Sequence, residues 1–87
     1  MLNLDKAKER LLNVVGIDFN IKFKKNDKGV TTISFKDEDT NVVVNLKFNE
    51  NTLATTIAPR EMEKEEFRYG LKEHMNDIKQ ILNESVE

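Results

Sequence analysis

The spacing of apolar residues along the chain changes period twice. At the start they recur every three or four positions after Asn3, a good helix N-cap, and Gly16 stands where a helix of this length would end. We therefore expect a helix over residues 3–15 with one apolar side turned inward. The residues of that side are Leu4, Ala7, Leu11, Val14 and Val15.

From residue 17 apolar and polar residues alternate, which is the period of a half-buried β-strand. Polar turns at 26–29 and 37–41 separate three strands, and a weaker fourth strand follows the turn at 49–51 and ends at Pro59. Turns this short join antiparallel neighbours. The inward residues expected are Ile17, Phe19, Ile21, Phe23, Thr31, Ile33, Phe35, Val42, Val44, Leu46 and Phe48, with Leu53, Thr55 and Ile57 in the fourth strand.

From about Glu61 the helical period returns, and Gly70 inside this helix indicates a close approach to another backbone or a kink. The order α-β-β-β-(β)-α predicts a single α+β domain over residues 1–87. We expect an antiparallel three- or four-stranded meander sheet with both helices packed on one face and water on the other. The apolar side of the second helix consists of Phe67, Leu71, Met75, Ile78, Ile81 and Leu82.

Composition excludes most catalytic and metal chemistry. The chain has 14 Lys and Arg, 16 Asp and Glu, one His and no Cys, so it forms no disulfide, thiol nucleophile or Cys/His zinc site. His74 lies beside apolar residues of its helix, and the turn at 37–39 lacks the pattern of a calcium loop. We therefore expect a protein that is not an enzyme and that holds no metal and no cofactor.

The same composition bears on location. No apolar run approaches the roughly 20 residues of a membrane span. The N-terminal segment lacks the apolar region of a signal peptide. With cysteine absent as well, we expect a cytoplasmic protein with no membrane partner.

The charges are unevenly distributed along the chain. Residues 1–48 hold nine bases and seven acids, whereas residues 49–87 hold five bases and nine acids. Because no aromatic residue joins the lysines on the outer side of the sheet, stacking on bases is not expected, and we rank nucleic acid below protein as a partner. The outward lysines are Lys22, Lys24, Lys36 and Lys47.

The element order resembles that of the double-stranded RNA-binding domain. In that family a basic cluster at the start of the second helix spans the phosphates. Here the corresponding residues 60–66 hold four acids and two bases, which would repel phosphates. The resemblance therefore covers topology only, and we exclude that family's function.

Two apolar residues of the second helix face away from its apolar side. On a helical wheel Met62 and Tyr69 share a stripe with Glu73. An outward Tyr and Met rimmed by polar groups have the composition of an interface anchor. The alternative is that they are ordinary isolated apolar residues on a surface.

Stoichiometric protein binding is therefore the function we expect. In size, acidity and element order the chain is similar to some small anti-CRISPR inhibitors encoded by bacteriophages. That resemblance implies an acidic surface that occupies a host defence protein's DNA site, with carboxylates in the place of phosphates. The carboxylates concerned are Glu61, Glu63, Glu65, Glu66, Asp37, Glu38 and Asp39.

Two alternatives belong to other classes of protein. One is a nucleic-acid-binding accessory protein that uses the four outward lysines. The other is a structural homodimer in which an edge strand or the stripe of Met62 and Tyr69 pairs with itself.

Overall fold

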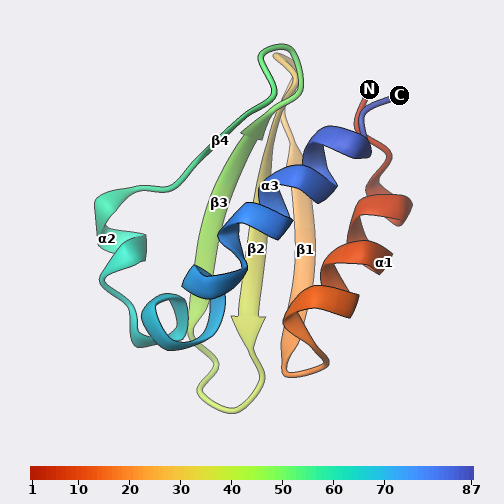
Figure 1. Ribbon diagram of the computed structural model, residues 1–87. Coiled ribbons are helices and arrows are strands. Elements are labelled where there is room, and N and C mark those ends of the chain that lie inside the picture. Colours follow the sequence, from red (N-terminus) through yellow and green to blue (C-terminus); the bar gives the residue numbers. More distant parts are fainter.

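The computed structural model describes all residues from 1 to 87 (Figure 1). Its four strands form one antiparallel sheet in the order β1-β2-β3-β4, with helical segments before and after it. This confirms the predicted α+β meander, with four strands. The elements are α1 (Leu4–Val15), β1 (Phe19–Lys25), β2 (Val30–Asp37), β3 (Val43–Asn49), β4 (Ala54–Thr56), α2 (Pro59–Met62), the π-helical turn η1 (Phe67–Leu71), the 3₁₀ turn η2 (Lys72–His74) and α3 (Met75–Glu84).

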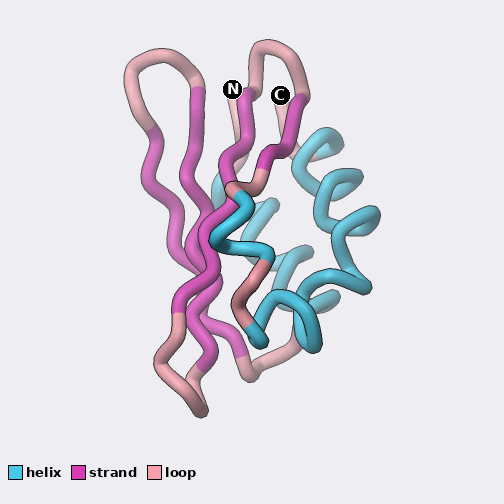
Figure 2. The backbone as a smooth tube through the Cα atoms, turned by 90° about the vertical axis from the view of Figure 1, so that its left-hand side faces the viewer, coloured by secondary structure: helices cyan, strands magenta, loops and turns pink.

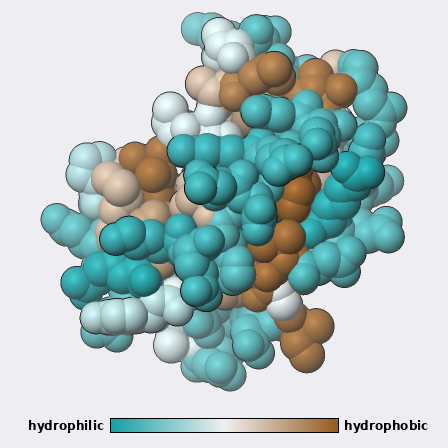
Figure 3. All heavy atoms as spheres, in the orientation of Figure 1, coloured by the Kyte–Doolittle hydropathy of each residue, from teal (hydrophilic) through white to brown (hydrophobic).

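The core lies between the sheet and the helices. Figure 2 shows the helices on one side of the sheet, as the strand alternation requires. Figure 3 shows that hydrophilic residues cover most of the helix-bearing face, with a narrow hydrophobic strip between α1 and α3. The buried apolar residues are Leu2, Ala7, Leu11, Phe19, Ile21, Ile33, Phe35, Val44, Leu46, Phe48, Phe67, Leu71, Ile78 and Leu82.

Helix α1 begins and ends where its sequence predicts. Asn3 Oδ1 accepts the Lys6 amide at 3.1 Å, and Gly16, with φ of 84°, donates its amide to the Leu12 carbonyl at 2.9 Å. The prediction that Leu4 turns inward is wrong, because buried Leu2 fills the core at this end of the helix.

The predicted inner face extends too far at two strand ends. Ile17 is 93% exposed, because pairing of β1 with β2 begins only at Phe19, after the turn that follows Gly16. Leu53 is 47% exposed and has φ of 60°, so it belongs to the turn before β4 and not to the strand. Alternation in the sequence continues beyond the last inter-strand hydrogen bond, which explains both errors.

The single second helix expected from Glu61 is wrong, since the structure has α2, η1, η2 and α3 in its place. Glu61, in α2, is buried, and its carboxylate accepts the Asn45 amide of β3. Further along, Gly70 lies against a ring of the core, where a Cβ would stand 3.1 Å from Phe19 Cζ. The close approach predicted for Gly70 therefore exists, but to a side chain and not to a backbone.

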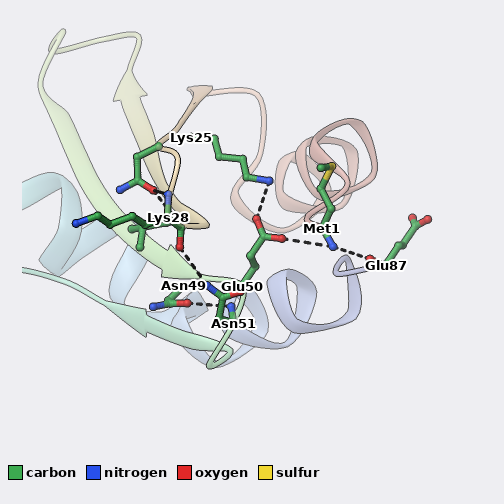
Figure 4. Close-up of polar contacts among 9 residues, drawn as sticks. Met1, Lys25, Lys28, Asn49, Glu50, Asn51 and Glu87 are labelled. Carbon is green, nitrogen blue, oxygen red and sulfur yellow. Dashed lines mark hydrogen bonds and ion pairs between the residues drawn. The ribbon is translucent and has the colours of Figure 1, made fainter.

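The turn between β3 and β4 connects three parts of the chain (Figure 4). Glu50 lies between the Lys25 ammonium, 2.7 Å from Oε1, and the Met1 amino group, 3.4 Å from Oε2. Hydrogen bonding by Lys25, with help from Met1, holds the pKa of Glu50 below its ordinary value although partial burial opposes this. Asn51 donates to the Lys28 carbonyl at 3.0 Å and joins the same turn to the β1–β2 turn.

Thr31→Val should raise the free energy of unfolding by about 1–2 kcal/mol. Thr31 is fully buried opposite Phe48, and its hydroxyl has no hydrogen-bond partner. Valine has nearly the same shape and removes the unpaired polar group. Urea denaturation followed by circular dichroism measures the change, and Thr32→Val on the other face of β2 is the control. Equal changes in both variants would show that the unpaired hydroxyl of Thr31 is not the cause.

Candidate functional site

A pocket of about 300 Å³ opens at the end of the sheet where β1 begins and β2 ends. Five carboxylates, two aromatic rings and one glycine line it. We call this site the acidic pocket. Its lining residues are Asp18, Phe19, Asp37, Asp39, Glu65, Glu66, Tyr69 and Gly70.

The register of the first hairpin forms one wall of the acidic pocket. Phe19 pairs with Asp37, so the residue before β1 meets the turn that follows β2. The Glu38 amide donates to the Asp18 carbonyl at 2.9 Å and fixes this junction. Two acidic segments that are distant in sequence therefore lie side by side.

The turn between β2 and β3 is held by its own first carboxylate. Asp37 Oδ1 accepts the Asp39 amide at 2.8 Å and the Thr40 amide at 3.2 Å. Asn41 completes the turn with φ of 63°, and its amide donates to the Asp37 carbonyl at 2.8 Å. The side chain of Asp37 is thus occupied in the turn, whereas no hydrogen bond or ion pair involves the side chain of Asp39.

The opposite wall comes from the π-helical turn η1 and the residues before it. Because Gly70 has no side chain, η1 can approach the Phe19 ring closely. This brings Tyr69, which is 79% exposed, to the mouth of the pocket. The guanidinium carbon of Arg68 lies 5.6 Å from the centre of the Tyr69 ring, so that ring already has a cation at its face.

The acidic pocket has a strongly one-sided charge. No Lys, Arg or His lines it, and none of its five carboxylates takes part in an ion pair. No three of them converge closely enough to hold one metal ion. The arrangement therefore suits an extended cationic group more than a single small ion.

The structure brings together five of the residues singled out in the sequence. Glu65, Glu66, Asp37, Asp39 and Tyr69 all line the acidic pocket. The other singled-out residues lie outside its lining: Met62 (40% exposed), Glu38, Glu63, Glu73 and Glu61.

Three residues of the acidic pocket were not predicted as site residues from the sequence: Asp18, Phe19 and Gly70. The available signal was the register of the first hairpin. Phe19 pairs with Asp37 and Lys25 with Thr31, so the hairpin is centred on Lys28, and position 18 lies beside position 38 and hence beside the acidic turn.

Glu61 was expected on the acidic surface, and that expectation is wrong, since this residue is 5% exposed. Its Oε1 accepts the Asn45 amide at 2.7 Å, and the Lys64 ammonium lies 2.8 Å from its Oε2. Lys64 also donates to the Val43 carbonyl at 2.6 Å. Since β4 pairs with β3 only at residues 47–49, Glu61 and Lys64 satisfy the edge of β3 that β4 leaves open.

Opposing effects determine the pKa of Glu61. Burial by itself would raise the pKa. The hydrogen bonds from Lys64 and from the Asn45 amide outweigh burial, and the pKa lies below its ordinary value. Glu61 is therefore an ionised structural group.

The outer face of the sheet carries the four lysines expected there. Lys22, Lys24 and Lys47 are exposed and Lys36 is half-buried. None of the four takes part in an ion pair.

Comparison with protein-family models, with curated proteins and with solved structures finds no match for this chain. None of its helices is both long enough and apolar enough to cross a membrane.

Proposed function

We propose that this protein is a non-enzymatic binding module that takes a basic segment of a partner protein into the acidic pocket. The single observation that supports this is the gathering of five carboxylates, none of them in an ion pair, and an exposed tyrosine around one pocket. The absence of cysteine is the reason for proposing a cytoplasmic location.

Charge and shape together favour a Lys- or Arg-bearing ligand. The attraction between a unit positive charge and a carboxylate 4 Å away is about 1 kcal/mol in water and about 4 kcal/mol near a protein surface. Tyr69 adds a ring face for a guanidinium or ammonium group, a position that Arg68 occupies at 5.6 Å in the free protein. An incoming arginine would replace an intramolecular contact with an equivalent one.

The more specific form of this proposal is an inhibitor, as the likeness to phage-encoded anti-CRISPR proteins implies. In that form Asp39, Glu65 and Glu66 take the place of phosphates on a basic, DNA-binding surface of a host defence protein. Glu61 has no part in it, because its carboxylate is bound to β3.

The test uses a fluorescent oligoarginine peptide as the probe and measures its affinity by anisotropy at low salt. The double variant Glu65→Gln, Glu66→Gln should bind about tenfold more weakly, since two exposed ion pairs contribute up to about 1 kcal/mol each. Tyr69→Ala should weaken binding less, by about two- to threefold, because an incoming arginine replaces the contact that Arg68 already makes with this ring.

The matched control is the double variant Glu9→Gln, Asp77→Asn, which removes the same charge from exposed positions on α1 and α3. It should retain most of the affinity. If both double variants lose affinity equally, net charge alone drives binding and the pocket has no special role. Absence of measurable binding by the unchanged protein would also overturn the proposal.

A further inference from the structure

The outer face of the sheet has a charge of one sign only. Four of its outward positions are lysines, and none is an aspartate or glutamate. None of these side chains is fully buried, and no helix covers this face (Figure 2). We call it the lysine face. Its outward residues are Asn20, Lys22, Lys24, Val30, Thr32, Ser34, Lys36, Val43, Asn45, Lys47, Asn49, Ala54 and Thr56.

The register spreads the lysines across three strands. Lys24 pairs with Thr32, and Thr32 pairs with Lys47, so the two lysines flank a threonine in one row. Neighbouring strands are about 4.8 Å apart, which separates these two lysines by about 10 Å at their backbones. Lys22 lies two positions before Lys24 on β1, about 7 Å away.

Neutral donors lie between the lysines. In the next row Lys22 pairs with Ser34, and Ser34 pairs with Asn45. The Ser34 hydroxyl donates to Asn45 Oδ1 at 2.7 Å. With Oδ1 engaged, the side-chain nitrogen Nδ2 of Asn45 makes no hydrogen bond within the chain and can donate outward.

The composition of the lysine face distinguishes between two kinds of anionic partner. Protein interfaces are enriched in aromatic residues, Met and Arg and depleted in Lys, and this face has lysines but none of the enriched types. Phosphate backbones are bound by Lys together with Ser, Thr and Asn. Single strands additionally need aromatic rings on which bases stack, and those are absent here.

We propose that the lysine face binds the phosphate backbone of a nucleic acid duplex without reading its sequence. Lys22, Lys24 and Lys47 make the main contacts. Lys36 contributes least, because it is half-buried and precedes Asp37 at the acidic pocket. This activity is independent of the proposed binding of basic segments, which uses other residues.

The experiment measures the affinity of the intact protein for a fluorescent DNA duplex of mixed sequence, from about 50 to 200 mM salt. We expect the protein to neutralise three to four phosphates. A plot of the logarithm of the binding constant against the logarithm of the salt concentration should then have a slope of about −3 to −4. The variant Lys22→Gln, Lys24→Gln should reduce the magnitude of that slope by about 2.

The matched control is Lys8→Gln, Lys79→Gln, which removes two exposed, unpaired lysines from α1 and α3. Its slope should stay at the value of the unchanged protein. If the control loses as much slope as the Lys22→Gln, Lys24→Gln variant, the proposal is wrong. Undetectable binding of the unchanged protein at the lowest salt would also overturn it.

Two further probes separate the alternatives. Single-stranded DNA of the same length should bind no more tightly than the duplex, and tighter binding would overturn the choice of a duplex. A polyglutamate peptide of equal charge should bind more weakly than the duplex. If it binds equally well and depends on the same lysines, the surface recognises an acidic protein and the proposal is wrong.

Discussion

Replacing Phe35 with alanine should lower the free energy of unfolding by about 3–5 kcal/mol. Phe35 is fully buried in the middle of β2, where it pairs with Ile21 on one side and Val44 on the other. Its ring meets the Phe19 ring edge to face, with centres 6.4 Å apart. Truncation removes these contacts and leaves a cavity that a sheet of fixed register cannot close.

The size of this loss matters because a domain of this length is stabilised by only about 4–13 kcal/mol in total. Urea denaturation followed by circular dichroism measures the change. Phe35→Leu is the control, since it keeps most of the volume and should cost less than half as much. If Phe35→Ala loses less than about 1 kcal/mol, the core is not packed around this ring as described.

Strand alternation identified the inner face of the sheet because side chains alternate with a fixed period of two. Phe19, Phe35 and Phe48 were all expected inside, and all three are buried. The same rule failed at Ile17 and Leu53, because a pattern of side chains carries no information on where inter-strand hydrogen bonds begin.

The second helix was misjudged because a tertiary contact overrides helical periodicity there. The period over residues 61–82 is helical, yet Glu61 and Lys64 bond to the open edge of β3, and α2 ends at Met62 between them. The stripe of Met62 and Tyr69 depended on one continuous helix, and only Tyr69 lines the acidic pocket.

The acidic pocket could be predicted only in pieces. Its carboxylates were visible in the sequence as two separate groups, at residues 37–39 and 65–66. The register of Phe19 with Asp37 and the contact of Gly70 with Phe19 bring these groups together. Both are long-range relations, which composition and period do not encode.

Glu61→Ala should lower the free energy of unfolding by about 2–3 kcal/mol. The change leaves the Asn45 amide without its acceptor at the edge of β3 and the Lys64 ammonium with the Val43 carbonyl alone. The expected loss is below that of a fully buried ion pair, because the Lys64 side chain is 32% exposed and water can partly replace the carboxylate.

Two control variants separate the contact from general effects of charge. Glu63→Ala removes an exposed carboxylate that has no ion pair and should change stability by less than about 0.5 kcal/mol. Lys64→Met, combined with Glu61→Ala in a double-mutant cycle, should show strong coupling. Additive losses in that cycle would mean that Glu61 and Lys64 act independently, contrary to the geometry.

The contribution of Glu61 should also depend on pH. Its pKa in the folded protein lies below the ordinary value near 4.5, so the carboxylate stabilises the fold above that value. This stabilisation is lost as the pH falls through the lower folded-state pKa. Glu50 has a lowered pKa too and acts with the same sign.

Stability of the unchanged protein should therefore fall between about pH 5 and pH 2, and Glu61→Gln should flatten that fall without abolishing it. The glutamine can still accept the Asn45 amide but has no charge to lose, whereas Glu50 continues to titrate. Urea denaturation at a series of pH values measures both curves. A Glu61→Gln curve parallel to that of the unchanged protein would show that Glu61 does not titrate with folding. The acid sensitivity would then come from Glu50 and other carboxylates, and the pairing of Glu61 with Lys64 would not be what holds the open edge of β3.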